Sequence, residues 1–262
     1  MIKLENLEVV GLEATIRGMR NPMNSWAKSD SGLCKGGDDG IGCKNCGCNK
    51  YGDGCDHSYD HSFRIGNNDH DLMMKLVKGG PVHAKFRRMI VVYVDITAPL
   101  YFWKEFDTYK VGTVANSCST MHKIQAKEFT LDDFSNEYLI SVGNMNWFDD
   151  DINCATAINT GIINKVSDDT YKIPMMPLEI LETTIASLNR CRAAFLESGD
   201  KRYWWQMVQL LPSSYNQKRT IMMNYEVLSG IYEYRHDHKL DEWRALCEWI
   251  KSLPYSELII QK

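Results

Sequence analysis

The sequence predicts an α+β fold, or α/β by a looser definition, for a chain of 262 residues. Apolar residues at helical spacing recur along most of the chain, which favours helices. One β-branched stretch, RRMIVVYVDITAP, is typical of a central strand. A polar, cysteine-rich stretch cannot form a core of its own and indicates an insertion. We therefore expect a single domain over residues 1–262, with the insertion at about 31–63.

The elements before the middle of the chain alternate between strand and helix patterns. A strand around LEVVGL comes first and a turn at RNP follows it. Beyond the insertion, DHDLMMKLVKGG has the spacing of a helix and ends in a glycine pair, a common helix stop. The strand RRMIVVYVDITAP ends at its proline, and LYFWKEFDTYK then returns to helical spacing.

The second half of the chain is predicted to be mostly helical. LEILETTIASLNRCRAAFLESG is an amphipathic helix that ends at Gly199, and KRYWWQMVQLLP is a helix that stops before Pro212. After the polar segment SSYNQKRT, we expect IMMNYEVLSGIYEYRHDHKLDEWRALCEWIKSLP to be long and largely helical.

Composition argues against two classes of partner. The net charge of -4 gives no electrostatic basis for wrapping a nucleic acid polymer. No apolar run approaches the roughly 20 residues that span a bilayer. The first 20 residues mix charges with apolar residues and lack the apolar core of a signal peptide. We therefore expect a cytoplasmic protein without a membrane anchor.

The cysteines are unevenly distributed, because five of the nine fall within the insertion. Cys43 and Cys46 form a C-x-x-C pair, which can present two thiolates to one metal ion, and Cys48 and Cys55 could complete a tetrahedral set. The pattern predicts structural zinc on these four residues. Two alternatives stay open, namely a loop whose thiols bind nothing and a redox or disulfide role.

A second segment of unusual composition is EFDTYKVGTVANSCSTMHKI, residues 105–124. Its small hydroxyl and amide residues, with one glycine, are poorly suited to filling a core. They are suited to a ligand, because a glycine lets backbone amides approach phosphates closely. The later segment RHDHK holds Arg235, which is either the exposed end of a helix or a guanidinium that reaches an anion or a carbonyl.

The same segment resembles the signature of flavin-dependent thymidylate synthases, R-H-R-x-x-S-x-N-E-x-S-x-R-Y. Allowing one extra residue before Asn116, that residue and Ser119 match outright, and Thr113 and Lys110 are conservative replacements. Three of the positions that are not kept in kind are Thr108 and Met121, in place of arginines, and Ser117, in place of the glutamate. The histidine of the signature is replaced by tyrosine.

The order of the surrounding elements strengthens the resemblance. VVYVDITAPLYFWKEF resembles the strand and helix that lead into the signature, and LVKGGPVHAKF resembles the turn before that strand. Downstream, Leu-Pro, Thr220, Asn224 and Arg235 follow the order in the family, and Arg235 comes eleven positions after Asn224, as in the family. The resemblance covers about residues 1–30 and 64–250. It implies a central antiparallel sheet flanked by long helices.

The resemblance also implies roles for individual residues. It gives Arg235 a catalytic role on the pyrimidine. The substrate-binding residues it implies are Glu105, Ser117, Ser119 and Arg235, and the cofactor-binding residues are Tyr109, Lys110, Asn116 and Asn224.

Enzymes of this family convert dUMP to dTMP by reductive methylation, with FAD as cofactor and NADPH and methylenetetrahydrofolate as co-substrates. The resemblance thus implies a flavin-dependent methyltransferase of thymidylate synthase type, or one that modifies a related pyrimidine nucleotide. It also implies a homotetramer, for which aromatic helices such as RYWWQMVQLL would supply interface area.

The loss of arginines leaves two other functions open. A nucleotide monophosphate is usually held by bidentate arginine contacts, and Thr108, Met121 and Val208 take the place of three such arginines here. The alternatives are a non-catalytic nucleotide- or flavin-binding protein of the same fold, and a zinc-stabilised interaction module.

Overall fold

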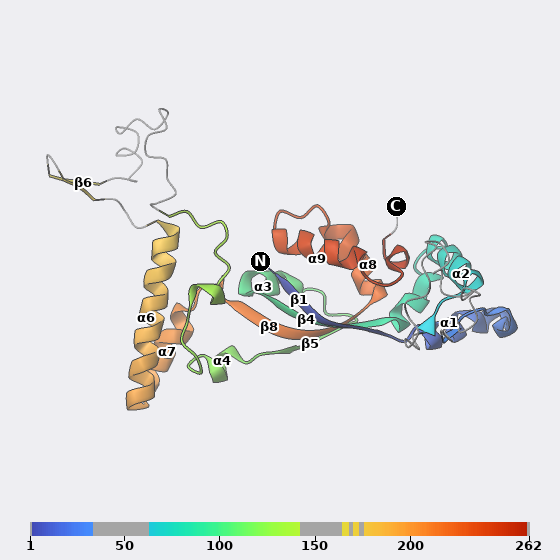
Figure 1. Cartoon of the computed structure of the whole chain (residues 1–262), viewed down its shortest axis with the longest axis horizontal. Helices are drawn as coiled ribbons and strands as arrows, with labels where there is room; N and C mark the ends of the chain where they lie inside the picture. The colour runs from blue at the N-terminus through green and yellow to red at the C-terminus, as the bar shows by residue number, and fades with distance from the viewer. Residues whose placement is uncertain (1, 34–62, 142–163, 168–169, 173–175, 261–262) are drawn as a thin grey trace, which may run out of the picture. The chain divides into compact units, whose positions relative to one another are not determined.

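The computed structural model describes residues 2–33, 63–141, 164–167, 170–172 and 176–260 (Figure 1). The described residues divide into two compact units. The sheet unit comprises residues 2–97, 104–117 and 218–262, and the helix-pair unit comprises 98–103 and 118–217. The single-domain organisation expected from the sequence stays a prediction. No helix in these described ranges is both long enough and apolar enough to cross a membrane.

The sheet unit begins with a strand and a helix and ends with two helices. Its first elements are β1 (Lys3–Val10), α1 (Leu12–Arg20), η1 (Asn21–Met23), η2 (Trp26–Lys28), β2 (Gly32–Leu33), β3 (Phe63–Arg64), α2 (Asn67–Lys78) and η4 (Ala84–Met89). The later elements are β4 (Val91–Pro99), α3 (Leu100–Phe106), β5 (Thr113–Ser117), β8 (Asn216–Asn224), α8 (Tyr225–Arg235), α9 (Asp241–Lys251) and η7 (Ser256–Leu258). The ends of β4, α3 and β8 extend into the other unit.

Four strands form the central sheet in the order β1-β4-β8-β5. β1 pairs antiparallel with β4, so that Lys3 lies opposite Thr97, and β5 pairs antiparallel with β8, so that Asn116 lies opposite Thr220. The antiparallel sheet and the many helices confirm the α+β prediction. A separate hairpin of β2 and β3 places Leu33 opposite Phe63.

One face of the sheet is covered by α8 and α9 (Figure 1). Every second residue of β4 points to this face, which is why its β-branched residues are buried. The core consists of apolar side chains from the sheet and from both helices: Val92, Val94, Ile96, Ile221, Met223, Leu228, Ile231, Trp243, Leu246 and Ile250, each at most 1% exposed.

The other face of the sheet carries a polar network around Asp95. Its carboxylate accepts hydrogen bonds from Thr220 Oγ1 at 2.6 Å and from Asn6 Nδ2 at 2.9 Å, and Lys218 Nζ lies 3.1 Å from it. These contacts, that of Thr220 first, lower the pKa of Asp95 to about 2. Tyr93, on the same face, is 41% exposed.

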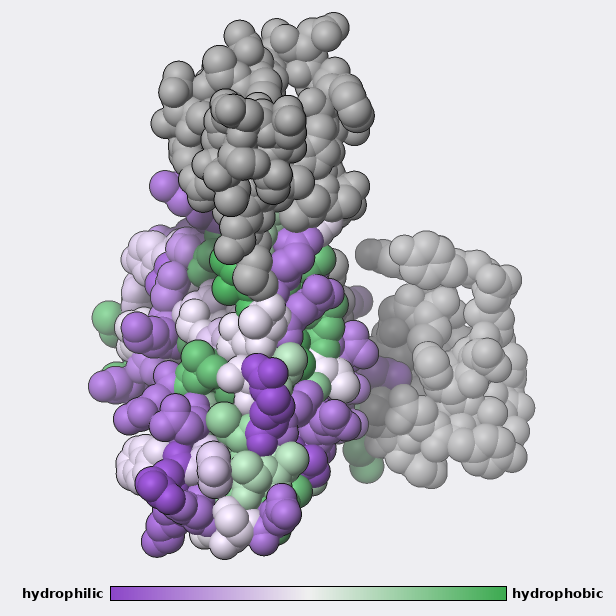
Figure 2. Space-filling model, turned by 90° about the vertical axis from the view of Figure 1, so that its left-hand side faces the viewer, coloured by the Kyte–Doolittle hydropathy of each residue, from purple (hydrophilic) through white to green (hydrophobic). Residues whose placement is uncertain are grey.

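The helix-pair unit is built around two antiparallel long helices. Its elements are α4 (Thr120–Lys123), η5 (Leu131–Asp133), β6 (Asn164–Ser167), β7 (Thr170–Lys172), α6 (Pro177–Ser198) and α7 (Lys201–Leu210). Gly199 ends α6 in the left-handed conformation, and Asp200 caps α7. Their shared core contains Ile124, Phe129, Phe134, Leu181, Leu188 and Met207. Figure 2 views the side on which α6 lies, where hydrophobic residues form separate patches among hydrophilic ones.

Both helices of this unit were predicted from the sequence, but strands β5 and β8 of the central sheet were not. The segment IMMN belongs to β8 and not to a long helix, and helix α8 begins only at Tyr225. Of the polar segment SSYNQKRT, only residues 216–220 are also part of β8. β8 does not show a continuous hydrophobic run in the sequence, because its outward residues, among them Lys218 and Thr220, are polar.

Candidate functional site

Five residues from three segments meet in the sheet unit. Glu105 is near the end of α3, Tyr109 is in the turn that follows, and Arg235 is the last residue of α8. His238 follows in the next loop, and Trp243 lies in the first turns of α9. We call these five residues the Arg235 cluster.

The guanidinium of Arg235 is held on two sides. Its Nε donates to Tyr109 Oη at 3.0 Å, and its Nη1 donates to Glu105 Oε2 at 3.2 Å. The guanidinium carbon also lies 4.7 Å from the centre of the Trp243 ring, within the range of a cation–π contact. The side chain of Arg235 is 22% exposed, so the cation is fixed but still reaches solvent.

One carboxylate oxygen of Glu105 lies close to three other members of the cluster. Oε2 accepts a second hydrogen bond from Trp243 Nε1 at 3.0 Å, and His238 Nε2 lies 3.6 Å from it. Phe106 stacks on Trp243 at 6.0 Å between ring centres and supports the platform. The carboxylate therefore holds both the guanidinium and the aromatic ring in place.

Asn224 adjoins the loop that precedes β5. Its Oδ1 accepts from the backbone N–H of Val227 at 3.0 Å and so caps α8. Gly112 has a φ of 75°, and a Cβ there would come within 3.0 Å of Asn224 Nδ2. The loop thus lies directly against Asn224, and only glycine fits this approach without displacement.

The remaining predicted site residues lie on the surface. Asn116 and Ser117 are exposed on β5, an edge strand of the sheet, and Lys110 is exposed in the loop before it. Ser119 belongs to the helix-pair unit, where its Oγ accepts from the N–H of His122 and caps α4.

The structure therefore brings together Glu105, Tyr109 and Arg235, three of the residues that the sequence assigned to nucleotide or cofactor. The metal ligands predicted at Cys43, Cys46, Cys48 and Cys55 lie outside the described residues. Within the residues that are described, no group of three or more His, Cys, Asp or Glu side chains could hold a metal ion.

Two members of the cluster were missed by sequence reasoning. His238 was within the segment RHDHK, and Trp243 was counted only as part of a long helix. A loop at His236–Leu240 separates α8 from α9 and returns the start of α9 toward the end of α8. Helical periodicity cannot show such a return.

Comparison with known proteins yields matches among solved structures only. No protein-family model and no curated protein matches the sequence. A thymidylate synthase X (ThyX) structure from Helicobacter pylori with FAD and dUMP matches over 98% of this chain and 96% of that chain, at 13% identity and a TM-score of 0.55. The chain has the fold of a flavin-dependent thymidylate synthase.

A second ThyX structure from Helicobacter pylori, also complexed with FAD and dUMP, covers 97% of this chain and 98% of its own. Its TM-score is 0.53 at 13% identity. The resemblance noted in the sequence is thus confirmed as a ThyX-like fold in a strongly divergent chain. The match spans nearly the full length of both proteins.

Proposed function

We propose that the protein is a divergent ThyX-like flavoenzyme that binds FAD and converts dUMP, or a related pyrimidine nucleotide, to its methylated product. The observation that carries this proposal is the Arg235 cluster. Glu105, Tyr109 and Arg235 come from segments up to 130 residues apart and are joined by hydrogen bonds. The matched ThyX structures hold FAD and dUMP, which supports the choice of ligands.

The cluster offers groups suited to a pyrimidine. Arg235 is anchored through Nε and Nη1, so its orientation is set before a ligand arrives, and a guanidinium can donate to a carbonyl or an anion. Trp243 supplies an aromatic surface beside it. Preorganised donors of this kind stabilise charge that develops on a ring carbonyl.

The residues around β5 fit a flavin. Asn116 is an exposed amide on the edge strand, and Lys110 is an exposed cation in the loop before that strand. Ser117, which the resemblance assigns to the nucleotide, is an exposed hydroxyl on the same strand. The pyrophosphate of FAD can accept hydrogen bonds from such groups. When bound, the flavin supplies the hydride, and the residues of this chain bind and orient the nucleotide.

A non-catalytic nucleotide- or flavin-binding protein is the second candidate. The observation that favours it is the ion pair between Arg235 and Glu105, which neutralises the cation on which a dianionic nucleotide would depend. Thr108, in place of an arginine, donates its hydroxyl to the carbonyl of Glu105 and so serves the helix end.

One purification separates the candidates. The full chain, purified without added cofactor, is expected to show flavin absorbance and to release FAD on denaturation. Supplied with NADPH and methylenetetrahydrofolate, it is expected to convert dUMP to dTMP. Protein that binds dUMP or flavin without turnover establishes the second candidate, and protein that binds neither refutes both.

The role of Arg235 is tested with a matched pair of variants. Arg235→Ala is expected to abolish turnover or dUMP binding, because it removes the one guanidinium of the cluster. The far-ultraviolet circular dichroism should stay unchanged. Arg190→Ala removes an exposed arginine on α6 and should change neither. Equal dUMP affinity and rate in both variants contradict the assigned role.

Other parts of the proposal rest on the resemblance or on the sequence pattern alone. They are the use of NADPH and methylenetetrahydrofolate, a homotetrameric assembly, the absence of nucleic acid polymers as partners, structural zinc at the cysteines and a cytoplasmic location.

A further inference from the structure

A cleft runs along α1 in the sheet unit and shares no residue with the Arg235 cluster. It consists of two cavities of about 320 Å³ and about 570 Å³. Glu13, Arg17 and Phe63 line both cavities, which therefore adjoin at these side chains. Cavities of such size accommodate small organic ligands. We call the pair the α1 cleft.

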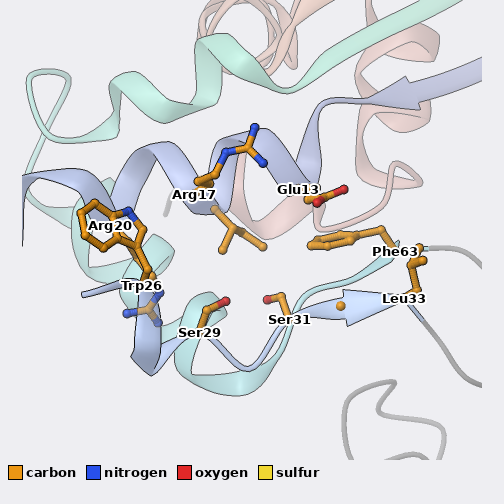
Figure 3. Close-up of a pocket in the computed structure, with 10 residues that line it drawn as sticks. Glu13, Arg17, Arg20, Trp26, Ser29, Ser31, Leu33 and Phe63 are labelled. Atoms are coloured by element: carbon orange, nitrogen blue, oxygen red, sulfur yellow. The ribbon is translucent and has the colours of Figure 1, made fainter. Parts of the chain in front are cut away.

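The walls of the smaller cavity are apolar and aromatic. Trp26 lies at one end and Phe63 and Leu33 at the other, with Ile16 also in the lining (Figure 3). Trp26 and Leu33 remain 50% and 63% exposed. Large apolar side chains left open to solvent around a cavity favour the binding of an apolar ring.

Three residues that line this cavity bind the buried carboxylate of Asp69. It accepts hydrogen bonds from Arg20 Nε at 2.5 Å and from the hydroxyls of Ser29 and Ser31 at 2.6 Å each. The hydroxyl of Ser31 also accepts from the N–H of Gly66 at 2.9 Å. These contacts fix the chain on both sides of the β2–β3 hairpin, so the cavity is formed before a ligand arrives.

Two arginines on α1 differ in what they contact. Arg20 is buried, and beyond Asp69 it donates to the carbonyls of Ser25 and Lys28. Arg17, one turn earlier, is exposed and makes no hydrogen bond or ion pair within the described part of the chain. Figure 3 shows Arg17 and Glu13 beside the cavity on the same helix. The α1 cleft thus combines aromatic walls with an uncommitted guanidinium.

We propose that the α1 cleft binds a small molecule whose aromatic ring carries an acidic group. The ring packs against Phe63 and Trp26, and the acid accepts hydrogen bonds from the guanidinium of Arg17. A guanidinium fork matches carboxylate and phosphate equally well, so the acid is of either kind. This inference does not depend on the proposed function.

The test is a binding titration of the full chain with four probes. 1-Naphthoate and adenosine monophosphate represent aromatic carboxylates and phosphates, and 1-naphthalenemethanol and adenosine are their neutral counterparts. At least one acidic probe is expected to bind with a dissociation constant below about 1 mM. If only the carboxylate probe or only the phosphate probe binds, the result identifies the kind of acid that the cleft accepts. Binding of both probes supports the shared chemistry.

Variants locate the binding in the cleft. Arg17→Gln is expected to weaken the acidic probe about tenfold, which corresponds to the loss of one charged contact, and to leave its neutral counterpart unchanged. Trp26→Leu should weaken acidic and neutral probes together, and Arg190→Gln should weaken none. The proposal is overturned if no acidic probe binds, or if Arg17→Gln leaves the affinity for it unaltered.

Discussion

At the scale of single residues, Asp95 shows how a short polar side chain stabilises an open sheet face. Its pKa is lowered because Thr220, Asn6 and Lys218 all stabilise the charged form. A carboxyl group whose pKa is lower in the folded chain stabilises the fold above its unfolded pKa of 3.8. That stabilisation is lost as the pH falls through about 2.

Thr220→Val tests this relation. The variant lacks the hydroxyl that donates to Asp95 at 2.6 Å, so the pKa of Asp95 should rise toward 3.8. A carbon-13 NMR titration of the carboxyl group measures the pKa. Thr97→Val, on the strand and sheet face of Asp95, serves as the control and should leave the pKa of Asp95 low. A pKa of about 2 in both variants would show that Thr220 does not set it.

At the scale of elements, the sequence predicted helices better than strands. α6 and α7 carry long apolar periodicities and were placed within a few residues. β5 was interpreted only as a ligand-facing segment, because four of its five residues are exposed and no alternation marks it. Its strand conformation comes from pairing with β8 across a long sequence separation, which no local pattern reveals.

The candidate site, too, was predicted only in part from the sequence. The resemblance predicted Glu105, Tyr109 and Arg235, because they occupy fixed places relative to recognisable strands and helices. It could not predict that Glu105 would bind Trp243 Nε1 as well, since that contact depends on where α9 returns. Tertiary position alone decides this part of the site.

The loop before β5 can be probed at Gly112. An alanine there would be strained by the φ of 75° and would also crowd Asn224 and Val227 at 3.0 Å. Gly80, with a φ of 88° and open space around it, is the matched control. Gly80→Ala should cost about 1 kcal/mol in the free energy of unfolding and Gly112→Ala on the order of 2 kcal/mol.

Urea denaturation measures the free energy of unfolding of both variants. We expect a lower midpoint and an unchanged slope in each. Equal losses in the two variants would mean that the contact with Asn224 adds nothing beyond backbone strain.

At the scale of the whole molecule, the β2–β3 hairpin marks where the cysteine-rich segment joins the fold. Leu33 and Phe63 are paired neighbours, so an Asn-Gly turn can connect them in place of residues 34–62. We expect this variant to unfold cooperatively near the temperature of the full chain, as followed by circular dichroism, and to retain nucleotide binding.

The same variant decides the zinc prediction. Metal analysis should find zinc in the full chain and none in the shortened one. Zinc absent from the full chain contradicts the prediction, and loss of cooperative unfolding in the variant shows that residues 34–62 support the fold.

The order of the strands has a consequence for synthesis on the ribosome. β8 lies between β4 and β5, yet it is the last of the four strands to be translated. β1 and β4 can pair early, but the buried side of β4 stays uncovered until β8, α8 and α9 emerge more than 100 residues later. Nascent chains arrested before residue 216 should therefore expose the apolar side of β4 and depend most on chaperones.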